Sequence, residues 1–179
     1  MDLSAQWQYL EEIAAQRLKN NITRRHVSQY GTYIELIGAA GELAARRFFH
    51  LPEELHTHLD GGTDMIYKDM RIDIKATVWT PKLQHRYLQW PVTKAVRADV
   101  ILLTAVKIEE KAAMVIGYAL PQEICNAPIN NHRDFPCHEI PIPILRTPIA
   151  LRIASCRADL YPKAQTYYRH QGYQEGARA

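Results

Sequence analysis

Residues 58–77 read HLDGGTDMIYKDMRIDIKAT, and this stretch predicts a β-hairpin. Two short runs with the apolar and β-branched residues of strands, Thr63–Tyr67 and Met70–Val78, lie on either side of a polar pair. We expect the turn at Tyr67-Lys68-Asp69-Met70, and a loop centred there gives the same register whether it has two residues or four. The stretch is also crowded with acids, namely Asp60, Asp64, Asp69 and Asp73.

Two of these acids, Asp64 and Asp73, are predicted to lie opposite each other in the hairpin. Directly opposed residues have Cβ atoms about 5 Å apart and point to the same face of the sheet. Two carboxylates in that arrangement repel each other unless a cation lies between them. Strand alternation puts Lys75 on the same face as Asp73, about 6.6 Å further along. This arrangement predicts a site for a hard divalent ion, with a lysine beside it.

Such a site has the parts needed to hydrolyse a phosphodiester. Mg²⁺ usually takes one or two carboxylates, keeps several waters and accepts phosphate oxygens, and Mn²⁺ is expected to substitute for it. A bound metal ion lowers the pKa of a coordinated water and neutralises charge on a phosphate. A neighbouring lysine can orient that water or stabilise the transition state.

A simpler interpretation of the same residues is a charged, solvated strand face. Asp73 and Lys75 would then offset each other, which contributes about 0–1 kcal/mol at a surface. That interpretation leaves the opposed pair Asp64 and Asp73 without an explanation, so we favour the metal site.

The rest of the chain predicts an α/β protein. We expect a helix over residues 2–19 and another over Gly31–His50, where apolar residues recur at steps of three and four. Two runs rich in Val, Ile and Leu, Asp99–Ile108 and Ala112–Leu120, predict adjacent strands. A short helix is expected to begin at PQEIC, and six prolines after Ala127 favour loops and short elements.

Composition limits the possible classes of protein. The chain has 179 residues, 47% of them hydrophobic, which suits one domain spanning residues 1–179. No apolar run is long enough for a transmembrane helix, and residues 1–16 lack the features of a signal peptide, so we expect a cytoplasmic protein with reduced cysteines. Net charge is only +3. The segment from Arg146 onward has six basic residues and two acidic ones, which is compatible with either a polyanionic partner or a solvated tail.

The pattern of Asp64 followed nine residues later by Asp73-Ile74-Lys75 resembles the PD-(D/E)xK nuclease superfamily. A glutamate on the helix before the hairpin, Glu42 in GAAGELAARRFF, resembles the acid that many members carry there, and Gly61-Gly62 precedes the first strand. The resemblance covers about residues 31–120. Thr63 stands where the proline of the motif would be.

This resemblance implies a restriction-endonuclease-like core, with a central mixed sheet of four to five strands flanked by helices. It implies that Asp64, Asp73 and the backbone carbonyl of Ile74 bind the metal, that Lys75 assists the attacking water, and that Glu42 is an outer-sphere or second-metal ligand. It also implies a homodimer or higher homo-oligomer.

Glu42 has an alternative role. Glu42 and Arg46 are spaced like a surface salt bridge of a helix, worth about 0.2–0.5 kcal/mol. Gly38 and Gly41 each cost up to about 1 kcal/mol in a helix, which close packing of the helix on the sheet would explain. Such packing would bring Glu42 towards the hairpin.

We therefore expect a Mg²⁺-dependent endonuclease that acts on DNA. Basic residues interleaved with aromatic ones after the hairpin could contact phosphates and stack on bases, or the aromatic side chains could pack on the core. One alternative is a nucleic-acid-binding or assembly protein that has this fold and does not cleave, and another is a hydrolase of small phosphate compounds. The candidate DNA contacts are Lys82, Arg86, Lys94 and Arg169.

Overall fold

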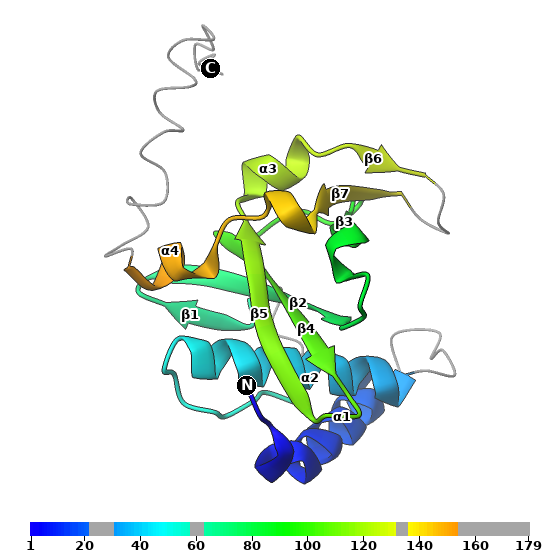
Figure 1. Ribbon diagram of the computed structural model, residues 1–179, viewed down its shortest axis with the longest axis vertical. Coiled ribbons are helices and arrows are strands. Elements are labelled where there is room, and N and C mark those ends of the chain that lie inside the picture. Colours follow the sequence, from blue (N-terminus) through cyan, green and yellow to red (C-terminus); the bar gives the residue numbers. More distant parts are fainter. Residues whose placement is uncertain (22–30, 58–62, 132–135, 154–179) are drawn as a thin grey trace, which may run out of the picture.

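The computed structural model describes residues 1–21, 31–57, 63–131 and 136–153 (Figure 1). Its main element is a four-stranded sheet, called sheet A here, with the strand order β1-β2-β4-β5. Strands β2 and β4 are parallel and the other two pairs are antiparallel, so the sheet is mixed. The strands span Met65–Tyr67 (β1), Met70–Val78 (β2), Val100–Lys107 (β4) and Ala112–Ala119 (β5).

The hairpin of β1 and β2 has the predicted register. Met65 pairs with Ile72 and Tyr67 with Met70, which leaves Lys68 and Asp69 as a two-residue turn. Both turn residues have positive φ, 47° and 64°, as the turn type that suits the twist of a two-residue hairpin requires. The predicted second pair of strands is also present as β4 and β5.

A second sheet, called sheet B here, was not predicted. It has the order β3-β7-β6, and both pairs are antiparallel. Its strands span Tyr87–Pro91 (β3), Ile129–Asn130 (β6) and Cys137–Pro141 (β7). Sheet B packs across one face of sheet A, with Leu88, Trp90 and Ile140 against Ile101 and Leu103.

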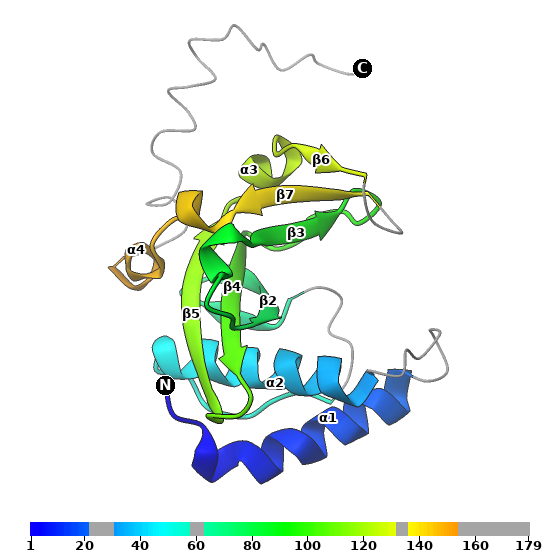
Figure 2. The ribbon, with the colours of Figure 1, turned by 45° about the vertical axis from the view of Figure 1, so that its right-hand side comes forward.

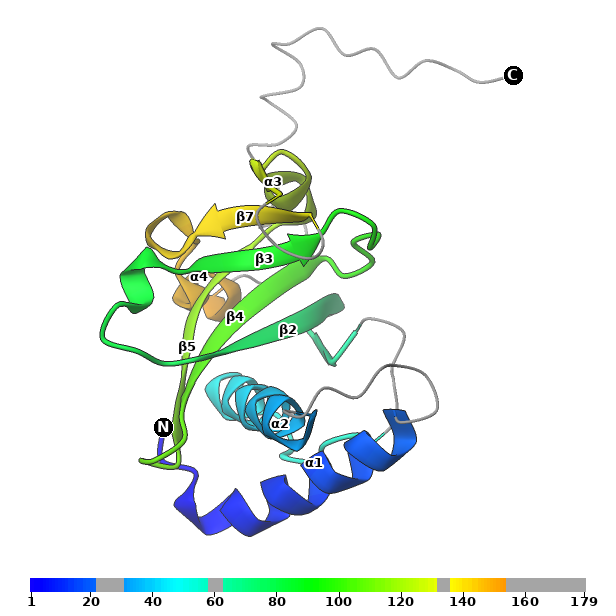
Figure 3. The same ribbon diagram turned by 90° about the vertical axis from the view of Figure 1, so that its right-hand side faces the viewer.

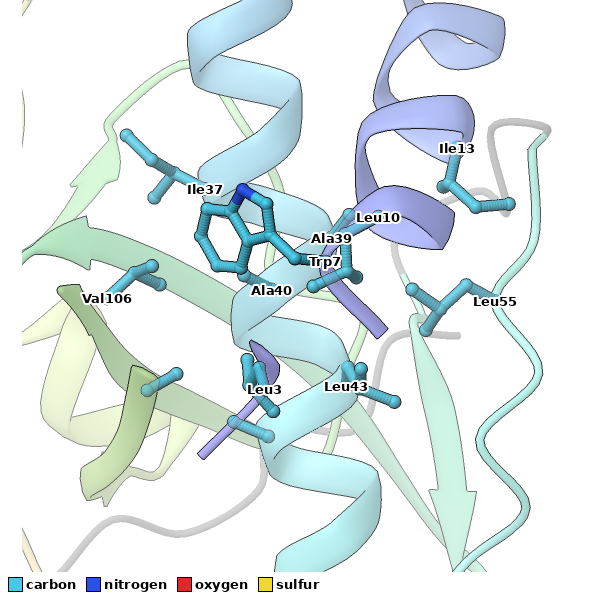
Figure 4. Close-up of a cluster of buried hydrophobic side chains, with 12 residues drawn as sticks. Leu3, Trp7, Leu10, Ile13, Ile37, Ala39, Ala40, Leu43, Leu55 and Val106 are labelled. Carbon is cyan, nitrogen blue, oxygen red and sulfur yellow. The ribbon is translucent and has the colours of Figure 1, made fainter. Parts of the chain in front are cut away.

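The helices α1 and α2 cover the other face of sheet A (Figures 2 and 3). Helix α2 lies directly on the sheet, and α1 packs on α2 through a cluster that includes Trp7, Leu10 and Leu43 (Figure 4). The helices span Trp7–Asn21 (α1), Gly31–Phe48 (α2), Pro121–Cys125 (α3) and Pro148–Ile153 (α4), with short 3-10 turns at Ser4–Gln6, Leu83–His85 and Ile142–Ile144.

Gly41 explains how closely α2 approaches the sheet. A Cβ atom at this position would lie 2.7 Å from the Cβ of Ala76 on β2 and would also collide with Thr104 on β4. The expectation of close packing is therefore confirmed for Gly41. It is wrong for Gly38, because a Cβ there would meet nothing within 4 Å.

The structure agrees with the predicted α/β class and with a mixed four-stranded sheet flanked by helices. The prediction of loops and short elements after Ala127 agrees with the described residues, where β6, β7 and α4 have two, five and six residues. Among the described residues, no helix is long and apolar enough to cross a membrane.

Candidate functional site

Asp73 lies in the middle of β2 and is only 2% exposed. Its side chain points towards sheet B, because α2 packs on the opposite face of β2, against Ile72 and Ile74. Lys75 Nζ donates to Asp73 Oδ1, and Lys94 Nζ lies 3.5 Å from Asp73 Oδ2. The interpretation of Asp73 as part of a solvated strand face is therefore wrong: this is a buried carboxylate with a lysine at each oxygen.

Trp90 on β3 forms one wall of this cluster. Its ring centroid lies 4.9 Å from Lys75 Nζ and 4.6 Å from Lys94 Nζ, so two ammonium groups share one indole. The face of an aromatic ring attracts cations. Because Trp90 is 2% exposed, it packs in the core and is not available to stack on a base. Of the two roles proposed for the aromatic residues after the hairpin, core packing is confirmed for Trp90.

Asp64 comes just before β1 and contacts the backbone of β2. Its backbone N–H donates to Ile72 O at 2.9 Å, and its Oδ2 accepts a 2.5 Å hydrogen bond from Ile74 N. The carboxylate of Asp64 thus lies at the peptide that joins Asp73 to Ile74. The opposed pairing of Asp64 and Asp73 was predicted as a continuation of the strand ladder, but β1 begins one residue later, at Met65.

Glu42 is bound by an arginine of the first helix. Arg17 Nη1 and Nη2 donate to the two oxygens of Glu42 at 2.6 and 2.7 Å, and both side chains are 13% exposed. The predicted partner Arg46 instead donates to the carbonyl oxygens of Pro52 and Asp64, at 3.2 and 3.3 Å. The interpretation of Glu42 and Arg46 as a surface salt bridge is therefore wrong.

Arg17 also connects Glu42 with the approach to the hairpin. Its Nε donates to His56 O at 2.8 Å, and Asn20 of the same helix donates to Thr57 O at 2.8 Å. Burial lowers the pKa of Arg17, but its hydrogen bonds and charge attraction to Glu42 outweigh this effect, and Asp64 adds to it, so the pKa is raised. Arg17 thus binds Glu42 directly, and Asp64 attracts it only at longer range.

The predicted oxygen donors for a divalent ion lie along β2, but an ammonium group lies at each oxygen of Asp73 and would have to move for a cation to bind there. Two carboxylates flank one peptide, and the carbonyl of Ile74 is the adjacent backbone oxygen. Among the described residues, no cluster of three or more His, Cys, Asp and Glu side chains could hold a metal. Mg²⁺ needs only one or two carboxylates, since waters and phosphate oxygens complete its shell.

The candidate DNA-contacting residues fall in different places. Lys82 and Arg86 are exposed on either side of the 3-10 turn before β3. Lys94, also predicted to contact DNA, lies beside Asp73 and keeps its side chain 46% exposed. Arg169, most of the basic C-terminal segment and Gly61-Gly62 lie outside the described residues.

Two members of the site were missed in the sequence. Arg17 is far from the motif along the chain, and no spacing rule joins it to Glu42. Trp90 could have been found, because Leu88 and Trp90 alternate with polar residues as they do in a half-buried strand. Comparison with family models, curated proteins and solved structures found no match for the chain.

Proposed function

We propose that the protein is a Mg²⁺-dependent nuclease that hydrolyses phosphodiester bonds of DNA. The site would be of the PD-(D/E)xK type, on a restriction-endonuclease-like fold. The observation that supports this proposal best is the buried carboxylate of Asp73 on β2. It contacts Lys75 of the same strand and Lys94 from the segment after β3, and Asp64 contacts the next amide of β2. Burial of a charge is costly, and a sequence that served only stability would avoid it.

Each residue has a defined role in this proposal. Asp64, Asp73 and the carbonyl of Ile74 would hold the metal ion, which supplies a water of lowered pKa and a positive charge beside the phosphate. Lys75, once released from Asp73, donates a hydrogen bond that orients the attacking water. Its positive charge also stabilises the negative charge that develops on the phosphate. Glu42, which Arg17 binds in the structure, would be an outer-sphere or second-metal ligand.

DNA is favoured over a small phosphate ester by the positive charge near the site. Lys82, Arg86 and Lys94 are exposed on the segment that leads from β2 through β3 towards β4. Basic side chains that follow one another along a surface neutralise successive phosphates of a polymer. Cutting both strands of a duplex requires two sites, so we include a homodimer or higher homo-oligomer in the proposal.

The main alternative is a protein that has the same fold, binds nucleic acid and does not cleave it. The pairing of Asp73 with Lys75 and Lys94 is also compatible with that role, because two partly exposed lysines attract phosphates without chemistry. Cleavage distinguishes the two functions directly.

The test is cleavage of plasmid DNA and of branched DNA in Mg²⁺ by the wild type, by Lys75→Ala and by Lys107→Ala. We expect Lys75→Ala to lower the rate by a factor of about 10² or more, the range for a residue that assists proton transfer. Lys107 is the matched control, since it also lies over a tryptophan, 4.1 Å from the ring of Trp79, and pairs with Glu110. Its loss should leave the rate unchanged, and EDTA should abolish cleavage by all three proteins.

Two results would count against this function. Equal rates of cleavage by the wild type and by Lys75→Ala would show that Lys75 of the hairpin takes no part in catalysis. Salt-dependent DNA binding without cleavage of either substrate would favour the binding protein.

A further inference from the structure

Lys94 is the one described residue from outside the hairpin whose ammonium group contacts Asp73. It follows β3 in the chain, whereas Asp73 and Lys75 are both on β2. Its side chain is 46% exposed, compared with 2% for Asp73. The distance of 3.5 Å between Lys94 Nζ and Asp73 Oδ2 is long for an ion pair. This lysine can therefore exchange its partner more readily than Lys75 can.

The backbone of Lys94 is held in place by Trp90. The indole N–H of Trp90 donates to Lys94 O at 2.6 Å, and Lys94 N donates to Pro91 O at 3.0 Å. The same indole lies beside the ammonium group of Lys94. One buried side chain thus fixes both the main chain and the charged end of Lys94.

The two lysines share one carboxylate. Lys75 and Lys94 each contact Asp73, whereas the carboxylate of Asp64 accepts from the amide of Ile74 and no ion pair between the described residues joins it to either lysine. Trp90 offers only a weak electrostatic attraction, and both lysines are partly exposed. The excess positive charge at a half-open position favours an anion, and an ammonium group binds phosphate oxygens as a point charge.

We propose that Lys94 is a second phosphate-binding residue of this site, that Trp90 is its positioning residue, and that the ligand is a phosphodiester group of the nucleic-acid backbone. This inference depends on the proposed function for the identity of the ligand. It deepens that function by placing Lys94, one of the basic residues proposed to face DNA, at Asp73, and by giving Trp90 a positioning role. It also predicts that Asp73 competes with the phosphate for Lys94.

The test measures binding of a fluorescein-labelled DNA duplex in EDTA over a range of NaCl concentrations. Asp73→Asn should bind more tightly than the wild type, because both lysines lose their competing carboxylate. Adding Lys94→Gln to Asp73→Asn should remove one phosphate contact and reduce the slope of log K against log salt by about 0.9. Lys94→Arg should preserve the slope, and Lys107→Gln, the control on Trp79, should leave it unchanged.

Trp90→Phe separates positioning from packing. This change keeps an aromatic ring and removes the donor to Lys94 O. If Trp90 acts through Lys94, Trp90→Phe should weaken binding when Lys94 is present and add nothing when Lys94 is already Gln. Equal weakening in both backgrounds would assign Trp90 a purely structural role and overturn that part of the proposal.

The outcomes are distinct from those of the cleavage test. Cleavage by the wild type with an unchanged salt slope in Lys94→Gln would overturn this inference and leave the nuclease in place. A reduced slope in a protein that does not cleave would support the phosphate contact and count against the nuclease. Absence of salt-dependent binding in all variants would overturn both.

Discussion

At the scale of single residues, the charged side chains of the site hold one another in position through ion pairs. Asp73 forms ion pairs with Lys75 and Lys94, and Glu42 forms an ion pair with Arg17. The two pairs lie in different parts of the fold, because α2 covers the face of β2 opposite to Asp73. Asp64 contacts the amide of Ile74, next to Asp73, and it attracts Arg17 only at longer range.

The Arg17–Glu42 pair should contribute measurably to stability. Hydrogen bonds to charged groups contribute about 1.5–3 kcal/mol, and this pair has two of them in a largely buried setting. Glu42→Gln and Arg17→Gln should each lower the free energy of unfolding by about 1–3 kcal/mol. Together they should cost less than the sum, as residues in contact do. Urea unfolding measures all three values.

Glu11→Gln provides the control, since Glu11 is exposed on α1. Glu11→Gln should change the free energy of unfolding by no more than about 0.5 kcal/mol. Unchanged stability in both variants of the pair would contradict this account. A well-folded Glu42→Gln that has lost cleavage would instead give Glu42 a direct role at the metal.

At the scale of elements, the contact between α2 and sheet A sets the position of the hairpin. Gly41→Ala should destabilise the protein by about 1–3 kcal/mol, because a new Cβ would displace α2 from β2 and β4. Gly38→Ala is the matched control in the same helix. Its Cβ would enter open space, so it should stabilise the protein by up to about 1 kcal/mol. Thermal unfolding of the two variants should therefore shift in opposite directions.

The elements that could be predicted from the sequence are the ones with local signals. The hairpin has a two-residue turn and contiguous strands, so its register follows from short-range spacing. Strands β4 and β5 are long, apolar and adjacent in the chain. Sheet B lacks these signals, since β3 pairs with β7 about fifty residues later, as in the pairing of Gln89 with Glu139, and prolines lie in or beside both strands.

In the site, too, the residues that could be predicted are the ones close together in the sequence. Asp64, Asp73 and Lys75 are in one hairpin, and alternation along β2 was enough to put Asp73 and Lys75 together. The places of Lys94 and Trp90 required knowledge of sheet B, because only its packing on sheet A brings them to Asp73. Arg17 required knowledge of how α1 packs on α2. Propensity and periodicity contain neither kind of information.

At the scale of the whole molecule, the substrate class determines how activity responds to salt. A DNA substrate that contacts several basic side chains should lose affinity steeply as salt rises, whereas a small phosphodiester should not. We expect cleavage of plasmid DNA at subsaturating enzyme to fall by at least tenfold between 50 and 200 mM NaCl. Hydrolysis of bis(p-nitrophenyl) phosphate should change much less over the same range.

Equal salt responses for the two substrates would favour the hydrolase of small phosphate compounds. Sedimentation of the protein with and without duplex DNA adds an independent observation. A stable dimer, or one formed on DNA, would support the two-site mode of cleavage that we propose. A monomer on DNA would restrict the proposed enzyme to cutting one strand at a time.

The parallel pairing of β2 with β4 has a consequence for folding. The chain leaves sheet A after Val78, forms β3 in sheet B, and returns to sheet A at Val100. Formation of the β1–β2 and β4–β5 hairpins closes only short loops. Pairing of β3 with β7 closes a much longer loop, which has a greater entropic cost. We therefore expect Asp73 and Lys75 to reach their folded positions before Trp90 and Lys94 do. A local opening of sheet B would remove the second lysine and expose the carboxylate while the hairpin stays folded, so the site can be assembled and dismantled in two stages.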